Sequence, residues 1–138
     1  MDETRCNVLL VNDDLIEIDM ARRAAVESRA TICLSVAKGG DAVVNWFGSG
    51  VVKNEQIPHL ILLDLKLPGL DGLEALRKLR GHAATRDIPI VVFSAQYTQA
   101  DVLKSYSAGA NSFVPKPANY EQLTEFFRER LEYWMPRH

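Results

Sequence analysis

Cysteine is scarce in this sequence. Only Cys6 and Cys33 occur among its 138 residues, which is too few for a disulfide scaffold. Their spacing also lacks the CxxC pattern that zinc and redox sites use. The sequence therefore predicts neither of these sites, and we expect both cysteines to be small buried thiols.

An excess of basic residues is also absent. Lys plus Arg number 16 and Asp plus Glu number 18, so the formal charge is 16 − 18 = −2. Proteins that bind a nucleic-acid backbone need positive charge to replace its counterions. We therefore expect no nucleic-acid partner.

Long apolar runs are missing as well. Leu60–Leu63 and Ile88–Phe93 are among the longest, and they fall far short of the ~20 residues that span a bilayer. The charged N-terminus, Met1–Arg5, lacks the apolar stretch of a signal peptide. These absences predict a cytoplasmic protein without membrane insertion.

The length and composition are those of one folded domain. A domain usually has roughly 100 to 200 residues, and the contents of 47% hydrophobic and 25% charged residues are ordinary for a globular chain. We expect a single domain over residues 1–138 with its core at about 7–133. Because the last predicted helix ends against Met135–His138, we expect no output domain after it.

Short apolar runs alternate with longer segments of helical periodicity, which is typical of a parallel sheet flanked by helices. Strands are expected at Asn7–Val11, Thr31–Val36, Leu60–Leu63, Ile88–Phe93 and Ser112–Val114. Helices are expected at Asp14–Ser28, Asp41–Phe47, Gly72–Leu79, Gln99–Ser107 and Tyr120–Tyr133. The pattern predicts a flavodoxin-like α/β fold, (βα)5, with a five-stranded parallel sheet in the order 2-1-3-4-5 and helices on both faces.

Polar residues follow four of the five predicted strands: Asp13 and Asp14 the first, Asp64 the third, Ser94 the fourth and Lys116 the fifth. Ligands of doubly wound sheets bind at the carboxyl ends of the strands. We therefore expect three carboxylates, a hydroxyl and an amine to converge at one edge of the sheet.

Three carboxylates at one edge need a balancing cation, since two like charges 4 Å apart cost roughly 4 kcal/mol at an effective dielectric constant of 20. Mg²⁺ is held by one or two carboxylates and keeps several waters, and a lysine adds a second positive charge. This combination suits phosphoryl transfer, which depends on positioning and charge neutralisation. A carboxylate nucleophile would then form an acyl phosphate.

The sequence resembles the receiver domain of two-component response regulators over nearly its whole length, about Asn7–Tyr133. The residues that carry this resemblance are Val11–Asp14, Leu62–Gly72, Ile88–Ala95, Gly109–Asn111 and Lys116–Pro117. The separations of 50 residues from Asp14 to Asp64 and 52 from Asp64 to Lys116 (64 − 14 and 116 − 64) are also similar to those of receivers.

The resemblance implies a role for each residue of the predicted metal and phosphorylation site. Asp64 would accept the phosphoryl group. Asp13 and Asp14 would be the acidic residues of a Mg²⁺ site, to which the backbone carbonyl of Lys66 would add a ligand. From the charge balance we expect Asp14 and Asp64 to bind the ion and Asp13 to act through water.

Four further residues form the predicted phosphoryl-binding and switch set. Ser94 and Lys116 would contact the phosphoryl group, and Phe113 would be the aromatic residue that reorients on activation. Small Ala95 would leave room for that movement. Receivers commonly have Thr where Ser94 stands and Tyr where Phe113 stands, so Phe113 lacks the phenol hydrogen bond of its usual counterpart.

The resemblance also implies partners. A histidine kinase or a histidine phosphotransfer protein would donate the phosphoryl group, and the domain would catalyse its own phosphorylation and dephosphorylation without being an enzyme. Output would pass through the last two helices and the last strand, Gln99–Tyr133, by homodimerisation or by docking to a partner.

Other interpretations remain open at this stage. A haloacid-dehalogenase-type phosphohydrolase also uses an aspartate nucleophile, but its DxD motif is absent because Leu15 follows Asp13 by two residues. A receiver-like interaction module that never takes phosphate is the third class. A more specific resemblance, to single-domain phytochrome-associated regulators, is carried by Asp101–Pro117 and Phe126–Trp134, although that subgroup usually has Asn in place of Lys66.

Overall fold

The computed structural model describes residues 6–28, 32–48, 57–67 and 71–134. In these residues strands and helices alternate as the sequence predicts. The strands are β1 (Cys6–Val11), β2 (Ile32–Ala37), β3 (Leu60–Asp64), β4 (Ile90–Ser94) and β5 (Ser112–Pro115). The α-helices are α1 (Leu15–Glu27), α2 (Gly40–Gly48), α3 (Gly72–Gly81), α4 (Gln99–Ser107) and α5 (Tyr120–Glu125).

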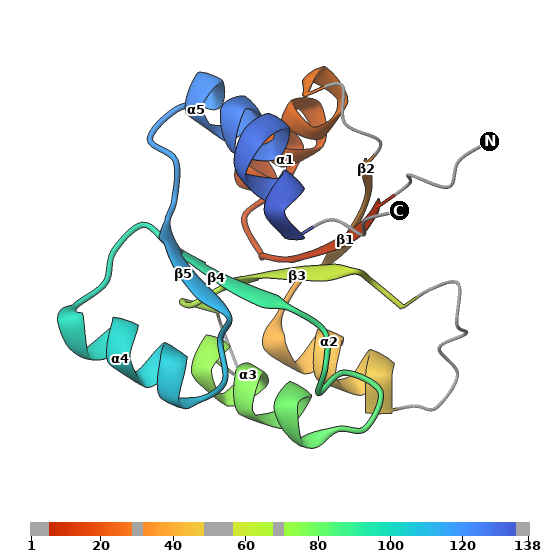
Figure 1. Cartoon of the computed structure of the whole chain (residues 1–138), viewed down its shortest axis with the longest axis vertical. Helices are drawn as coiled ribbons and strands as arrows, with labels where there is room; N and C mark the ends of the chain where they lie inside the picture. The colour runs from red at the N-terminus through yellow and green to blue at the C-terminus, as the bar shows by residue number, and fades with distance from the viewer. Residues whose placement is uncertain (1–5, 29–31, 49–56, 68–70, 135–138) are drawn as a thin grey trace.

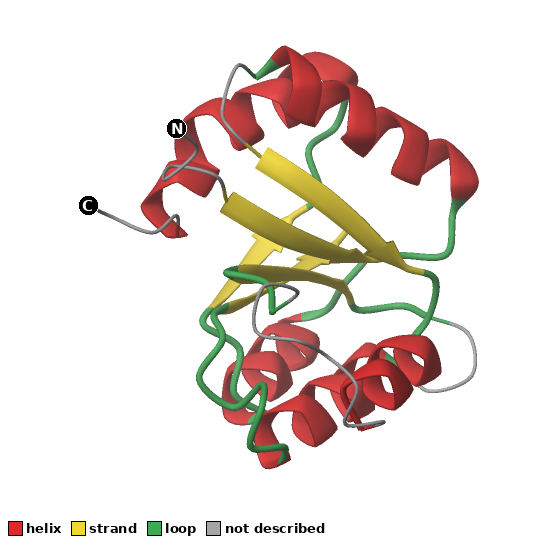
Figure 2. Ribbon diagram, turned by 90° about the vertical axis from the view of Figure 1, so that its right-hand side faces the viewer, coloured by secondary structure: helices red, strands yellow, loops and turns green. Residues whose placement is uncertain are grey.

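The strands form one sheet in the order β2-β1-β3-β4-β5, and each neighbouring pair is parallel. Helices α1 and α5 cover one face, and α2, α3 and α4 cover the other (Figures 1 and 2). The predicted flavodoxin-like fold, including its strand order, is therefore confirmed. None of the helices in the described part of the chain is long and apolar enough to cross a membrane.

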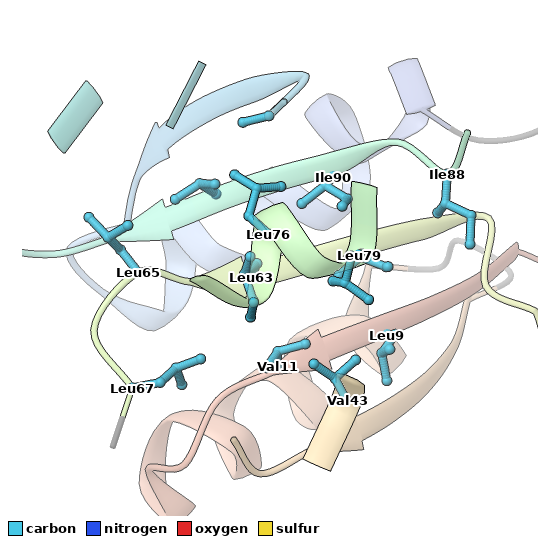
Figure 3. Packing of buried hydrophobic residues seen from close by; sticks show 14 of the residues in the cluster. Leu9, Val11, Val43, Leu63, Leu65, Leu67, Leu76, Leu79, Ile88 and Ile90 are labelled. Atoms are coloured by element: carbon cyan, nitrogen blue, oxygen red, sulfur yellow. The ribbon is translucent and has the colours of Figure 1, made fainter. Parts of the chain in front are cut away.

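Burial explains the sequence pattern of the strands. Every residue of β3 and of β4 is buried, because helices cover both faces of these central strands. Figure 3 shows how Leu76 and Leu79 of α3 pack over the sheet beside Leu63 and Ile90. Edge strand β2 instead has no buried residue, and exposed and partly exposed residues alternate over Ile32–Ser35.

The fourth strand begins two residues later than predicted. Ile88 is buried, but it belongs to the preceding turn: its N–H donates to the carbonyl of Thr85 at 3.1 Å, and its own carbonyl accepts from Arg80 Nη1 at 2.7 Å. Apolar character alone therefore extended the predicted strand too far. Thr31, the predicted start of the second strand, lies outside the described residues.

The last predicted helix is not one regular α-helix. After α5 the chain makes a π-helical turn at Phe126–Arg130 and a 3₁₀ turn at Leu131–Trp134. Adjacent Phe126 and Phe127 are both buried, with 4% and 1% of their surface exposed. A π turn changes the angular spacing of successive residues, which suits the burial of two neighbouring rings.

The prediction that both cysteines are buried is wrong for Cys33. Cys6 on β1 is buried, but Cys33 is exposed, because it lies on the outer strand of the sheet, where alternate residues face solvent. Burial raises the pKa of the Cys6 thiol to about 11. The Cys6 thiol is therefore both inaccessible to solvent and hard to ionise.

We expect a thiol reagent such as a nitrobenzoate disulfide to modify one cysteine of the native protein rapidly at pH 8. Absorbance should report one thiol per chain before denaturant and a second after it, because Cys6 becomes accessible only on unfolding. Cys33→Ser should remove the rapid phase. Two equally rapid phases in the native protein would contradict the burial of Cys6.

Candidate functional site

The carboxyl ends of four strands bring the predicted site residues to one edge of the sheet. Val11 pairs with Leu63, so the residues after β1 lie beside Asp64 at the end of β3. Ser94, at the end of β4, pairs with Pro115, the residue before Lys116. The site is thus assembled from chain segments that are far apart in the sequence.

Asp64 is a buried carboxylate, with 7% of its surface exposed. Its Oδ1 accepts the backbone N–H of Lys66 at 3.3 Å, and its Oδ2 accepts Lys116 Nζ at 3.0 Å. Burial raises the pKa of Asp64 above its ordinary value, and the positive charge of Lys116 opposes this only in part. A carboxylate held at a strand end with a paired lysine is a suitable nucleophile for an electrophile that enters from solvent.

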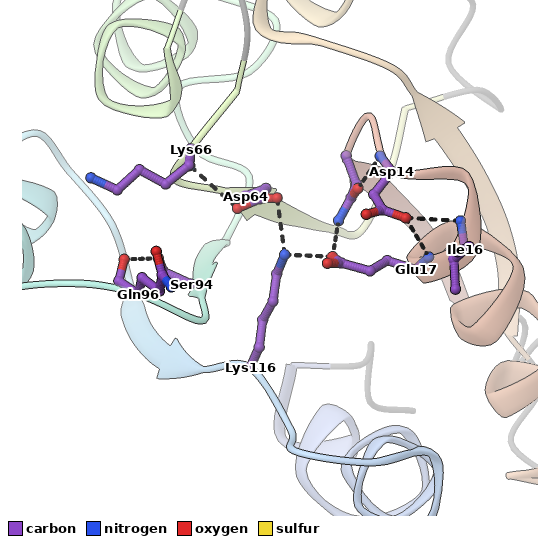
Figure 4. Close-up of polar contacts among 9 residues, drawn as sticks. Asp14, Ile16, Glu17, Asp64, Lys66, Ser94, Gln96 and Lys116 are labelled. Atoms are coloured by element: carbon purple, nitrogen blue, oxygen red, sulfur yellow. Dashed lines mark hydrogen bonds and ion pairs between the residues drawn. The ribbon is translucent and has the colours of Figure 1, made fainter.

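Lys116 lies between two carboxylates (Figure 4). Its Nζ is 2.5 Å from Glu17 Oε1 and 3.0 Å from Asp64 Oδ2, and 17% of its side chain is exposed. Burial lowers the pKa of Lys116, but the hydrogen bonds and charges of Glu17 and Asp64 outweigh burial and raise it above its ordinary value. Lys116 therefore stays an ammonium ion at neutral pH.

Glu17 is a site residue that sequence reasoning missed. It lies in the first turn of α1, three residues after the N-cap Asp14, where an acidic residue is common for helix capping alone. The sequence therefore contained a signal, but it had an ordinary structural explanation. Glu17 contacts Lys116 only because α1 packs beside the end of β5.

Asn12 was also missed, and it connects β1 to this network. Its side chain is buried; Nδ2 donates to Glu17 Oε1 at 2.9 Å, and Oδ1 accepts the backbone N–H of Asp14 at 2.7 Å. The polar chain therefore runs from Asn12 through Glu17 and Lys116 to Asp64. It links the ends of β1, β5 and β3.

The three predicted carboxylates do not gather into one cluster. Asp13 and Asp14 are exposed, and Asp14 Oδ1 accepts the N–H groups of Ile16 at 2.9 Å and Glu17 at 3.1 Å as the N-cap of α1. In the ranges that the structure describes, no three acidic, histidine or cysteine side chains lie close enough to hold a metal together. Lys116, rather than a third carboxylate, lies against Asp64.

Ser94, Ala95 and Phe113 lie on the β4 and β5 side of the site. Ser94 is fully buried, and its hydroxyl donates to the carbonyl of Gln96 at 2.9 Å rather than to Asp64. Ala95 is exposed and Phe113 is partly buried. The Phe113 ring packs against that of Tyr97, with 4.9 Å between their centroids.

Lys66 connects the site to α4. Its backbone N–H donates to Asp64, while its ammonium group lies 3.7 Å from Asp101 Oδ2 in the first turn of α4. The Lys66 side chain is 64% exposed, so this ion pair contributes little stability. The neighbouring residues 68–70, which belong to the motif after Asp64, lie outside the described residues.

Comparison with known proteins agrees with this geometry. Residues 8–128 match the response regulator receiver domain family. The chain belongs to this family. A probable methanogenesis regulatory protein, FilR2 of Methanothrix harundinacea, is 30% identical over 128 residues, which cover 93% of this chain and 83% of FilR2. This membership does not support the haloacid-dehalogenase alternative.

Two further relatives have solved structures. Response regulator Rcp1 of Synechocystis is 28% identical over 93% of this chain and 88% of its own; its Mn²⁺-bound crystal structure has a TM-score of 0.79 and covers 96% of both chains. The phosphorylated cyanobacterial phytochrome response regulator RcpA has a TM-score of 0.84 at 28% identity, over 96% of this chain and 99% of its own. These relatives support the resemblance to phytochrome-associated regulators.

Proposed function

We propose that this receiver domain is a phosphorylation switch in which Asp64 accepts a phosphoryl group from a histidine kinase or a histidine phosphotransfer protein in the cytoplasm. The observation that carries the proposal is the buried Asp64 carboxylate with Lys116 Nζ 3.0 Å away. A carboxylate oxygen would form the bond to phosphorus while the bond to the donor's leaving group breaks, leaving an acyl phosphate. Lys116 would stabilise the charge on the phosphoryl oxygens.

The donor set at this edge fits a Mg²⁺ ion. Carboxylates follow the paired strands β1 and β3, and Mg²⁺ needs only one or two of them. We propose that Asp13 and Asp64 hold it with the backbone carbonyl of Lys66; Asp14 is less suited, because its Oδ1 already accepts two helix N–H groups. When bound, the ion would supply charge neutralisation for phosphoryl transfer.

The output surface that we propose is the face formed by Gln99–Tyr133. Leu103 and Tyr106 of α4 are 63% and 48% exposed there, and Tyr133 is 69% exposed. Aromatic and large apolar residues are common at the centres of protein interfaces. Ser94 would turn from Gln96 toward the phosphoryl group, and Phe113 would then change its packing against Tyr97. These movements would shift the protein's conformational equilibrium toward a second state of this surface, which binds another copy of the chain or a partner.

Intact-mass measurement tests this function. After incubation with acetyl phosphate and Mg²⁺, we expect the wild-type chain to gain the mass of one phosphate and Asp64→Asn to gain none. Asp19→Asn is the matched control, because Asp19 forms an exposed pair with Arg23 on α1. Removal of the metal with EDTA should prevent the gain. Phosphorylation of Asp64→Asn, or none of the wild type, would refute the proposal.

A further inference from the structure

We propose that Glu17 is a positioning residue that restrains Lys116 in the unphosphorylated protein and thereby slows the movement of Lys116 to an incoming phosphoryl group. This inference rests on the proposed phosphorylation of Asp64. It assigns a function to a side chain that helix capping alone would otherwise explain.

Glu17 does not perform the usual task of its position. An acidic residue three positions after an N-cap commonly reaches back to accept the N-cap's own N–H. Here the N–H of Asp14 donates instead to Asn12 Oδ1 at 2.7 Å. Asn12 thus completes the cap, which leaves the Glu17 carboxylate free to turn toward the site.

The ammonium group of Lys116 is held closer to Glu17 than to Asp64. The distances from Nζ are 2.5 Å to Glu17 Oε1 and 3.0 Å to Asp64 Oδ2. The same Glu17 oxygen also accepts Asn12 Nδ2 at 2.9 Å, so a buried side chain fixes the position of the carboxylate. Figure 4 shows Lys116 between the carboxylates of Glu17 and Asp64.

Phosphorylation would change this balance. A phosphoryl group attached to Asp64 would attract the ammonium group toward its oxygens and away from Glu17. Glu17 therefore favours the unphosphorylated arrangement, through a charge-assisted bond to Lys116.

The test compares substitutions at Glu17 with a matched change elsewhere on α1. Glu17→Gln keeps the shape and removes the charge, whereas Glu17→Asp keeps the charge and shortens the reach by about 1.5 Å. We expect both substitutions to speed phosphorylation by acetyl phosphate at saturating Mg²⁺ about fivefold. This is the change in rate that corresponds to losing one partly exposed charged contact. Both should bind a beryllofluoride phosphate mimic more tightly by a similar factor.

Glu27→Gln is the control. Glu27 lies on the same helix, but its carboxylate accepts a hydrogen bond from the Tyr120 hydroxyl at 3.0 Å, away from the site. The phosphorylation rate of Glu27→Gln should therefore equal that of the wild type. Thermal melting confirms that each variant is folded. If Glu17→Asp behaves as wild type while Glu17→Gln is faster, charge rather than contact is responsible and the positioning role is refuted; unchanged or slower rates in both variants also refute it.

A second measurement does not depend on phosphorylation. In metal-free wild-type protein, nitrogen NMR should detect the Lys116 ammonium group protected from exchange with water. The signal should be lost in Glu17→Gln and retained in Glu27→Gln. If the wild type takes no phosphate while this NMR difference holds, only the proposed function of Asp64 fails; if the signal is equal in all three proteins, the restraint by Glu17 is refuted.

Discussion

Replacing Lys116 by methionine is expected to slow phosphorylation of Asp64 about 100-fold, the typical effect of removing one preorganised donor from a site where charge develops. Methionine keeps a long apolar stem but has no ammonium group. Asp64 would then lose the cation that lies 3.0 Å from its Oδ2. A time course of intact mass with acetyl phosphate at saturating Mg²⁺ gives the rate directly.

Two other substitutions make this result interpretable. Lys104→Met makes the same chemical change at an exposed position of α4 and should leave the rate unchanged. Lys116→Arg keeps the charge but presents a planar group of different reach, so we expect an intermediate rate. If Lys116→Met reacts within about threefold of the wild type, a difference of less than 1 kcal/mol, Lys116 does not stabilise the transferred group.

The second large effect is expected at Gly72, the first residue of α3. Its N–H donates to the carbonyl of Leu65 at 3.0 Å. A Cβ added at Gly72 would lie 2.6 Å from the carbonyl oxygens of Asp64 and Leu65, so it would collide with backbone that cannot rotate away. We expect Gly72→Ala to lower the free energy of unfolding by about 3 kcal/mol, measured by urea denaturation.

Gly81, at the other end of the same helix, provides the matched control. A Cβ there would meet nothing within 4 Å, so Gly81→Ala should be neutral or stabilise the protein by up to about 1 kcal/mol. Because the collision at Gly72 involves the backbone of Asp64, Gly72→Ala should also slow phosphorylation under conditions where it is folded. Equal stability of the two alanine variants would show that the chain relaxes around the added methyl group.

The amino-acid sequence by itself determined the fold and most of the candidate site. The continuous apolar runs of β3 and β4 mark strands covered on both faces, and the alternation with helical segments implies a parallel sheet. In such a sheet the carboxyl ends of the strands meet at one edge, which is why the sequence alone places Asp64, Ser94 and Lys116 together. These inferences succeed because they depend on local periodicity and on a general property of the topology.

Only the tertiary structure decided which hydrogen-bond and ion-pair partners the site residues have. Glu17 and Lys116 are 99 residues apart, and their contact depends on how α1 packs relative to the end of β5. The Asp14 carboxylate caps α1 because the N–H groups of Ile16 and Glu17 lie within its reach. Sequence periodicity carries no information on such choices between competing hydrogen bonds.

Tertiary packing also explains the exposure of Cys33 and the π turn at Phe126–Arg130. Cys33 is an apolar residue in an apolar run, and only its place on the outer strand of the sheet leaves it exposed. Phe126 and Phe127 are adjacent in the sequence and both are buried in the core. The Phe126 ring packs against that of Phe93 in β4, with 4.9 Å between their centroids. A local pattern specifies which residues prefer burial, whereas the assembled sheet and helices determine how much buried space each position receives.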